Sequence, residues 1–447
     1  MFKCLGLNLS KNSFYELKNR LFFLLISVIV FRLGCFIPIP GINTSVLSQI
    51  FVKKHGTIID MFNIFSGGSL SRASIFTLGV MPYISASIII QLLTLVVPFL
   101  KEIKKNGESG NLKINEYIRY TTVFFAFFQA IGISFGLPNI LGIYHLVINP
   151  NIFFYLISII TLVTGTVFLM WLGELITEKG IGNGISIFIF IGIISEIPYH
   201  FLNIIFQIKQ GNFSFYLFLM LFFLLFFLLY VIVFIECSQR KIKVFYSRRQ
   251  YTQRSYKEKN SYLPLKINIS GVIPSIFSSS IIIFPTTICS WLNADNFLVY
   301  YYNIIKNFFL YFHINTLIYI IIYSCLIIFF CFFYSLLIFN PKEVSKNLKK
   351  SGVFIFGIRP GFKTENYIKK IMFRVTFIGS FYIILICLIP DIIKDFFYIP
   401  FYFGGTSFLI VTVVIIDFIS QIQTLMLSSQ YKNVLKKSNL NFNKKYY

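Results

Sequence analysis

Acidic residues are scarce in this sequence, and so are the residue types that carry most enzymatic chemistry. The 447 residues include 16 Asp and Glu against 40 Lys and Arg, with only four His and two Trp. The histidines are scattered without HExxH spacing, and no phosphate-binding P-loop motif occurs. We therefore predict a protein that is not an enzyme, without a metal site or a cofactor. Any driving energy must come from a partner or from the membrane potential.

Cysteine is present, but not in a redox or metal-binding pattern. None of the seven cysteines forms a CxxC pair, and most lie in or near apolar runs. This placement favours buried, reduced thiols over a disulfide framework.

Apolar residues dominate what is there. The chain is 56% hydrophobic and 13% charged, with a mean hydropathy of +0.76. Apolar runs of about twenty residues recur, which is typical of a polytopic all-α membrane protein. We predict ten transmembrane spans, at about 20–38, 74–97, 118–137, 152–172, 183–205, 214–236, 268–291, 316–339, 371–390 and 402–426.

Basic residues are distributed unevenly between alternate loops. The segments that include both termini hold 30 Lys and Arg, whereas the opposite set holds six. Cytoplasmic loops carry such an excess, so both termini are predicted to be cytoplasmic. Five spans lie in residues 1–210 and five in 211–447. Because that number is odd, two halves of the same fold would be inverted relative to each other.

Residues 57–66 form a predicted helix that is too short to cross a membrane. Thr57 and Asp60 have capping-box spacing, and the pair Gly67-Gly68 suits a helix end. Ten residues span about 15 Å, roughly half of the ~30 Å hydrocarbon core. Two interpretations remain: a segment that dips into a protein-lined cavity, or a helix that lies flat on the membrane surface.

Two predicted cytoplasmic loops, 237–267 and 340–370, are long and basic. Residues 236–266 alternate around IKVFY and predict a β-hairpin, whereas PKEVSKNLKKSG predicts a short helix that ends at Gly352. The turn FGIRPG then presents Arg359. Attraction to anionic lipid explains the charge. Thirty residues of folded loop suit docking of an acidic or RNA-bearing partner.

Several stretches together resemble the SecY family of protein-conducting channels, and they cover the chain nearly end to end. They include FRLGCFIPIPGI (31–42), MFNIFSGGSLSRASIFTLGVMPYISASIIIQLLT (61–94), GESGNLKINEYIRY (107–120), LVTGTVFLMWLGELITEKGIGNGISIFIF (162–190), LPLKINISGVIPSIFSSSIIIFP (263–285), FNPKEVSKNLKKSG (339–352), GIRPG (357–361) and PFYFGGTSFLIVTVVIIDFISQIQTLMLSSQY (400–431). The resemblance implies a bacterial inner-membrane channel for unfolded polypeptides.

The resemblance also implies roles for individual residues. The short helix and its flank, residues 57–72, would be a plug in the external funnel, with plug residues Ile58, Ile59, Phe62, Phe65, Gly67 and Gly68. An aliphatic pore ring would consist of Val80, Ile84, Ile185, Ile189, Ile276 and Ile410. A lateral gate for membrane segments would include Ser85, Gln91 and Phe284. Arg248, Arg249 and Arg359 would dock a motor or a ribosome.

The partners implied by the resemblance are the small subunits SecE and SecG, the ATPase SecA, the ribosome, signal sequences, unfolded client proteins and anionic lipid. The accessory proteins SecDF and YidC extend this set. Energy would come from the motor, the ribosome or the proton-motive force.

The ring has a physical logic of its own. The pairs 80/84 and 185/189 have i, i+4 spacing, so each pair presents one helix face. A narrow aliphatic ring dewets and blocks ions without offering a hydrogen bond. Spacing alone favours ordinary core or lipid-facing aliphatics at these positions, and only the resemblance indicates a pore ring.

Breakers and charges within the spans have two interpretations as well. Pro82 inside the second span, and Gly182, Gly184 and Gly271 at span starts, would loosen gate helices or be ordinary membrane-helix residues. Asp417 and Arg32 are the notable charges within spans, and we expect structural pairing or snorkelling for both.

Two other function classes compete with a protein-conducting channel. A secondary transporter would share broken helices and inverted halves, but it should place polar substrate groups near the midplane, where this chain predicts aliphatic residues. A passive anchor or scaffold would need neither a half-helix nor an aliphatic ring.

Overall fold

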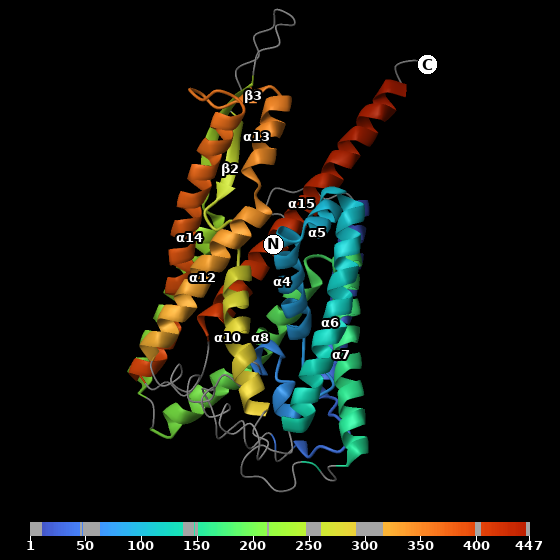
Figure 1. The fold of residues 1–447 in the computed structure, drawn as a ribbon, viewed down its shortest axis with the longest axis vertical. Coiled ribbons are helices and arrows are strands. Elements are labelled where there is room, and N and C mark those ends of the chain that lie inside the picture. The colour runs from blue at the N-terminus through green and yellow to red at the C-terminus, as the bar shows by residue number, and fades with distance from the viewer. Residues whose placement is uncertain are drawn as a thin grey trace, which may run out of the picture.

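The computed structural model describes residues 11–44, 47, 63–136, 147, 151–211, 214–246, 261–291, 316–397 and 404–443. Helices dominate this part of the chain, and a small sheet lies at one end (Figure 1). Ten long helices each overlap one predicted span: α1 (Lys11–Phe36), α4 (Met81–Val96), α6 (Glu108–Gly136), α7 (Ile152–Lys179), α8 (Gly184–Lys209), α9 (Phe215–Cys237), α10 (Ile273–Trp291), α12 (Thr316–Ile338), α14 (Phe362–Phe397) and α15 (Gly405–Asn443).

Judged by length and composition, the helices account for part of the ten predicted spans. Among the described residues, eight helices are long and apolar enough to cross a membrane. A ninth span results if α4 is joined to α5 (Pro98–Lys105), which is bent away from it by 97°. The described part of α10, Ile273–Ile282, forms a shorter apolar helix. The fold is therefore polytopic and all-α within the membrane, and the count of ten stays a prediction.

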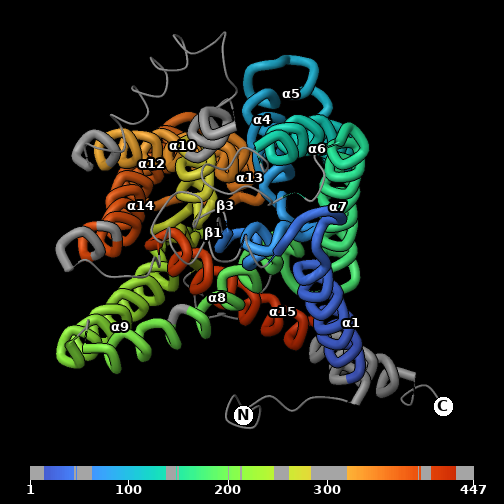
Figure 2. Tube along the Cα trace, turned by 90° about the horizontal axis from the view of Figure 1, so that it is seen from below, coloured from blue at the N-terminus to red at the C-terminus, as the bar shows by residue number. Residues whose placement is uncertain are grey.

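The helices form two groups (Figure 2). On one side α4 packs on α6 and α6 on α7; on the other side α10 packs on α12 and α12 on α14. The last helix, α15, contacts α1 and α8 of the first group as well as α9 and α14 of the second. One large apolar cluster draws on both groups. The groups are thus joined by packing through α15 and by an apolar contact in the centre.

The second predicted span begins later than the sequence pattern indicates. Residues 74–80 form turns, and α4 starts at Met81, with Val80 as its N-cap. Pro82 is the second residue of α4, where its missing N–H would have no partner in any case. The prediction that Pro82 loosens the interior of this span is therefore wrong: Pro82 starts the helix.

The two basic loops fold into one unit. The predicted hairpin is confirmed: β1 (Gln239–Tyr246) pairs antiparallel with β2 (Ser261–Lys266). The predicted short helix is α13 (Pro341–Lys350), and its N-cap Asn340 accepts a hydrogen bond from the Lys342 amide. An unpredicted strand, β3 (Val353–Phe354), pairs with β1 and extends the sheet in the order β2-β1-β3. Loops that are about a hundred residues apart in sequence therefore share a sheet.

This unit has a small core of its own. Ile242 of β1, Leu265 of β2 and Val353 of β3 are buried against Ile368 and Ile371 of α14. The helix α14 has 36 residues, about 54 Å at 1.5 Å per residue, so it is longer than a ~30 Å hydrocarbon core requires. Its first turns support the sheet outside the apolar layer.

Close backbone contact fixes the start of α8 against α7. A Cβ atom at Gly184 would collide with the carbonyl oxygen of Gly173 in α7. The Gly184 amide donates to Oγ1 of Thr177, 3.1 Å away, and that hydroxyl in turn donates to the Gly173 oxygen at 2.9 Å. Only glycine allows this approach, because the contacted atom belongs to the backbone and cannot rotate away.

We predict that Gly184→Ala lowers the free energy of unfolding by about 1–3 kcal/mol, the usual cost of overpacking. The measurement is SDS-induced unfolding of the purified protein in detergent. Ile197→Ala is the control, because Ile197 lies on the same helix with 37% of its surface exposed. Equal effects of the two changes would contradict the close α7–α8 contact.

Candidate functional site

The exit loop, residues 63–80, leads from the predicted plug into α4 and is held by its own hydrogen bonds. The Asn63 oxygen accepts from the Gly68 amide at 2.9 Å, and its side-chain Oδ1 accepts from the Ser71 amide at 2.9 Å. Gly67 and Gly68 have φ of +69° and +78°, which lets the chain reverse directly after residues 63–65. A short 3-10 helix, η2 (Leu70–Arg72), follows.

Predicted plug residues fall partly on this loop. Phe65 is buried in the central apolar cluster, and Gly67 and Gly68 make the tight turn. Ile58, Ile59 and Phe62 lie outside the described residues. Backbone pairing ties the loop to the end of α1, because the Ile75 amide donates to the Ile37 oxygen at 3.0 Å and the Ile39 amide to the Ala73 oxygen at 2.9 Å.

The six predicted ring residues come from four helices. Val80 and Ile84 belong to the start of α4, Ile185 and Ile189 to α8, Ile276 to α10 and Ile410 to α15. The structure places all six in the central apolar cluster: Val80, Ile84, Ile189 and Ile410 are buried, and Ile185 and Ile276 are partly buried against the cluster. Their assignment to a pore constriction stays a prediction.

One hydrogen bond joins α4 to α12 at the predicted lateral gate. The Tyr334 hydroxyl donates to Oε1 of Gln91 at 2.5 Å, and Nε2 of Gln91 donates to the Ser87 hydroxyl at 3.1 Å. Ser85 bonds within its own helix, to the Met81 oxygen. The side chain of Phe284 lies outside the described residues.

Aromatic contacts fill the rest of this α4–α10–α12 contact. Phe277 of α10 meets the Tyr334 ring edge-on, with centroids 5.4 Å apart, and meets Phe330 in the same manner at 5.8 Å. Tyr334 and Phe277 are not among the gate residues predicted from the sequence. A buried tyrosine in a run that is otherwise aliphatic and Phe-rich is the signal that could have found Tyr334, because its hydroxyl needs a partner.

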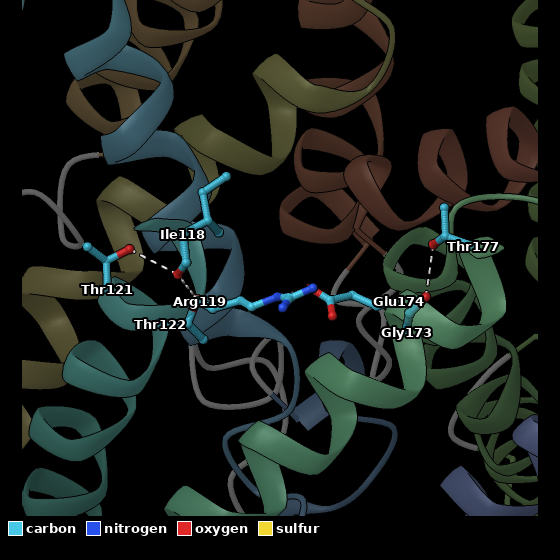
Figure 3. A network of polar contacts seen from close by, with 7 residues as sticks. All are labelled: Ile118, Arg119, Thr121, Thr122, Gly173, Glu174 and Thr177. Atoms are coloured by element: carbon cyan, nitrogen blue, oxygen red, sulfur yellow. Dashed lines mark hydrogen bonds and ion pairs between the residues drawn. The ribbon is translucent and has the colours of Figure 1, made fainter. Parts of the chain in front are cut away.

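An unpredicted ion pair joins two helices of the first group (Figure 3). Nε of Arg119 on α6 lies 2.8 Å from Oε1 of Glu174 on α7. The nearby hydroxyls of Thr122 and Thr177 donate to carbonyl oxygens within their own helices, those of Ile118 and Gly173. The pair is the direct ionic link between α6 and α7 in the described part of the chain.

The predicted docking loop presents Arg359 to solvent. Gly357 and Gly361 have φ of +76° and +113°, so the turn around Arg359 is sharp. The Arg359 carbonyl accepts from the Thr364 hydroxyl at 2.9 Å, and the Ser345 hydroxyl of α13 donates to the Gly361 oxygen at 2.8 Å. The backbone is fixed, whereas the guanidinium is exposed. Arg248 and Arg249 lie outside the described residues.

A charge interaction relates α13 to the short helix α5. Burial lowers the pKa of the Lys104 ammonium, and the nearby charge of Glu343 on α13 acts against this shift. The charges of Lys104 and Glu343 thus lie near each other across the two helix groups, at the end where the sheet lies.

The structure also shows where the intramembrane charges and the cysteines noted in the sequence lie. Asp417 is exposed on α15, and Arg32 donates to a backbone oxygen of the exit loop. Among the described residues, five cysteines form no disulfide: Cys35, Cys331 and Cys387 are buried, whereas Cys237 and Cys325 are exposed. The expectation of buried thiols is thus met by three of the five and not by Cys237 and Cys325, which lie on the apolar helices α9 and α12. In the described ranges, no cluster of His, Cys, Asp and Glu could hold a metal ion.

Known proteins match this chain over nearly its full length. The family model of SecY matches residues 74–419. The protein translocase subunit SecY of Buchnera aphidicola subsp. Schizaphis graminum is 57% identical over 443 residues, 99% of this chain and 100% of the relative. The same subunit of Escherichia coli strain K12 is 54% identical over 431 residues, 96% of each chain.

Solved structures share the fold. A protein-conducting channel matches with a TM-score of 0.63 at 16% identity, over 92% of this chain and 93% of the other. A SecY protein whose plug domain stabilises the closed channel, and Sec61 of a canine ribosome–channel complex, both match with a TM-score of 0.58 over the same shares, at 17% and 15% identity.

The hydrogen bond between Tyr334 and Gln91 is testable by a double-mutant cycle. We predict that Tyr334→Phe lowers the free energy of unfolding by about 1 kcal/mol, because it leaves the Gln91 oxygen without its donor. The double variant with Gln91→Leu should be destabilised by about 0.5–1.5 kcal/mol less than the sum of the two single variants. The measurement is SDS-induced unfolding, with Tyr230→Phe on the exposed face of α9 as the control. Additive effects would contradict the bond.

Proposed function

The chain belongs to the SecY family, and on that premise we propose that it is the central pore-forming subunit of a protein translocation channel. It acts as a passive conduit for unfolded polypeptides, with energy supplied by a partner motor, a ribosome or the proton-motive force. Apolar segments of the client leave sideways through the lateral gate, because they partition into lipid. This function is that of a transporter and requires no catalytic group.

The observation that carries the proposal is the aliphatic character of the central cluster. Val80, Ile84, Ile189 and Ile410 are buried there from three helices, with Ile185 and Ile276 beside them. Such side chains offer no hydrogen bond to ions, to water or to a moving peptide. A transporter for small polar solutes would instead need polar groups at this depth. The six residues are therefore proposed as the constriction.

The two halves, residues 1–210 and 211–447, are proposed to separate at the α4–α10–α12 contact. Opening there would break the side-chain hydrogen bond from Tyr334 to Gln91 and would part the rings of Phe277 and Tyr334. A signal sequence is the proposed wedge, because its apolar helix can replace these contacts. The plug, residues 57–72, would move aside at the same time.

The sheet unit is the proposed docking surface for the motor SecA or a ribosome on the cytoplasmic side. Its support is the rigid backbone around the exposed Arg359 and the basic charge of both loops. A related channel, Sec61, occurs in a complex with a ribosome. We further propose a bacterial inner-membrane location with both termini cytoplasmic, and assembly with SecE, SecG and anionic lipid. Clients, SecDF and YidC complete the proposed partners.

We predict that Ile84→Gly combined with Ile189→Gly raises the resting ion conductance of the purified channel in planar bilayers at least tenfold. Removal of both side chains opens the constriction to water. Ile89→Gly combined with Ile194→Gly is the matched control. It places the same two changes on α4 and α8 at positions with 37% and 38% exposure, outside the buried cluster. If the variant with both ring substitutions keeps the resting conductance of the parent, Ile84 and Ile189 do not form the constriction.

Charge reversal at the docking loop tests the second part of the proposal. Arg359→Glu should reduce SecA-driven translocation into membrane vesicles by about 30-fold or more, since a like charge at a docking contact costs several kcal/mol. Lys179→Glu, an equal charge change at an exposed position at the end of α7, should leave the rate within about twofold. Membrane insertion of both variants is compared by alkaline extraction. An unchanged rate with Arg359→Glu would exclude Arg359 from the docking surface.

A further inference from the structure

Arg32 forms a charged link between α1 and the exit loop. It lies one turn before the end of α1, and its Nη1 donates to the carbonyl oxygen of Gly67 at 3.1 Å. The side chain is half-buried. Gly67 is the first of the two glycines at which the chain reverses after the predicted plug helix. The bond therefore holds the plug at its junction with the rest of the chain.

The ring of Phe36, at the end of α1, contacts the guanidinium groups of Arg32 and Arg72. The guanidinium carbon of Arg32 lies 5.3 Å from the centre of the Phe36 ring, and that of Arg72, which belongs to the exit loop, lies 4.1 Å from it. Cation–π contacts of this kind stabilise the arrangement and fix both side chains. One ring of α1 thus orders two arginines, one on each side of the contact between helix and loop.

The helix α8 closes the site opposite α1. A Cβ atom at Gly67 would lie 3.1 Å from the Cα atom of Gly192, and a Cβ atom at Gly68 would collide with the carboxylate of Glu196. The backbone of the loop therefore touches the backbone of α8. The Gly67 carbonyl is fixed between two helices with its oxygen directed to Arg32.

We propose that Arg32 is a positioning residue that latches the plug in the closed channel, an inference that rests on the proposed function. In the closed state its guanidinium satisfies a carbonyl that water reaches poorly, and such charge-assisted bonds are stronger than neutral ones. When the plug leaves, the Gly67 oxygen departs and the bond is broken. The latch thus lowers the population of the open state without any contact to the client.

A native thiol reports on the latch. Cys35 has no exposed surface, and its Sγ lies 4.0 Å from the Ser66 oxygen of the exit loop. Displacement of the loop removes this cover, so reaction of Cys35 with a maleimide measures how often the latch opens. Cys237, which is exposed at the end of α9, serves as the reference for reagent activity in the same sample.

The experiment compares Arg32→Gln with the unmodified full-length protein in proteoliposomes. Labelling at Cys35 and Cys237 is followed by peptide mass spectrometry, and resting conductance is measured in planar bilayers. Arg32→Gln should raise the Cys35 labelling rate relative to Cys237 by roughly tenfold, the factor that corresponds to the loss of one charge-assisted hydrogen bond. Arg32→Lys keeps the charge and should show a smaller rise.

Arg20→Gln is the matched control, because Arg20 lies on the same helix and also donates to a backbone oxygen, that of Gly180. It should leave both measurements at the parental level. If Arg32→Gln labels like the parent, or if Arg20→Gln raises Cys35 labelling equally, the latch is excluded. Failure of the pore proposal gives a different result, since the double ring variant would then stay tight whatever Cys35 does.

Discussion

A membrane channel for polypeptides must exclude ions at rest and must still come apart, and the central apolar contact is proposed here to meet both demands. The central cluster draws on α4 and α8 from one helix group, on α10, α12 and α14 from the other, and on α15 between them. Dispersion and the exclusion of water hold such a contact, and neither requires a fixed geometry. In the described residues, the hydrogen bond from Tyr334 to Gln91 is a polar link between α4 and α12. A buried polar atom that loses its partner is costly in lipid, whereas apolar surfaces can part without that cost.

Irregular backbone is the second constraint, because lipid offers no hydrogen bonds to it. The exit loop meets this constraint in three ways: its own turns, the pairing of residues 37–39 with 73–75, and the Arg32 guanidinium at Gly67. Glycine at positions 67 and 68 is required both for positive φ and for contact with α8. The result is a non-helical segment with backbone hydrogen bonds of its own and apolar side chains buried in the neighbouring clusters.

Patterns of period and charge were sufficient to predict the helices, the hairpin and α13, because each depends on residues that are near in sequence. The strand β3 has two residues and pairs with β1 about a hundred residues away, so no local pattern could indicate it. The same holds for Tyr334 with Gln91 and for Arg32 with Gly67, where the partner is fixed only by packing. The late start of α4 was in principle readable from Pro82, since proline favours the first turn of a helix over its interior. Assignment of ring residues relied on the family resemblance, because buried and lipid-facing isoleucines look alike in sequence.

The loop that follows the proposed plug and the proposed constriction share one core, and on this proposal that has a mechanical consequence. Ile64 and Phe65 of the exit loop lie in the same cluster as Val80, Ile84 and Ile189. Val80 is also the N-cap of α4, so the loop runs without a break into the first ring position. Withdrawal of the loop would remove packing atoms from the ring and free the start of a gate helix in one motion. A ring sealed by dispersion alone weakens as soon as its neighbours leave, because contact energy falls steeply with a gap of 0.5–1 Å. On this proposal, plug displacement and ring widening would be two aspects of one equilibrium, and the bond from Arg32 to Gly67 would bias both.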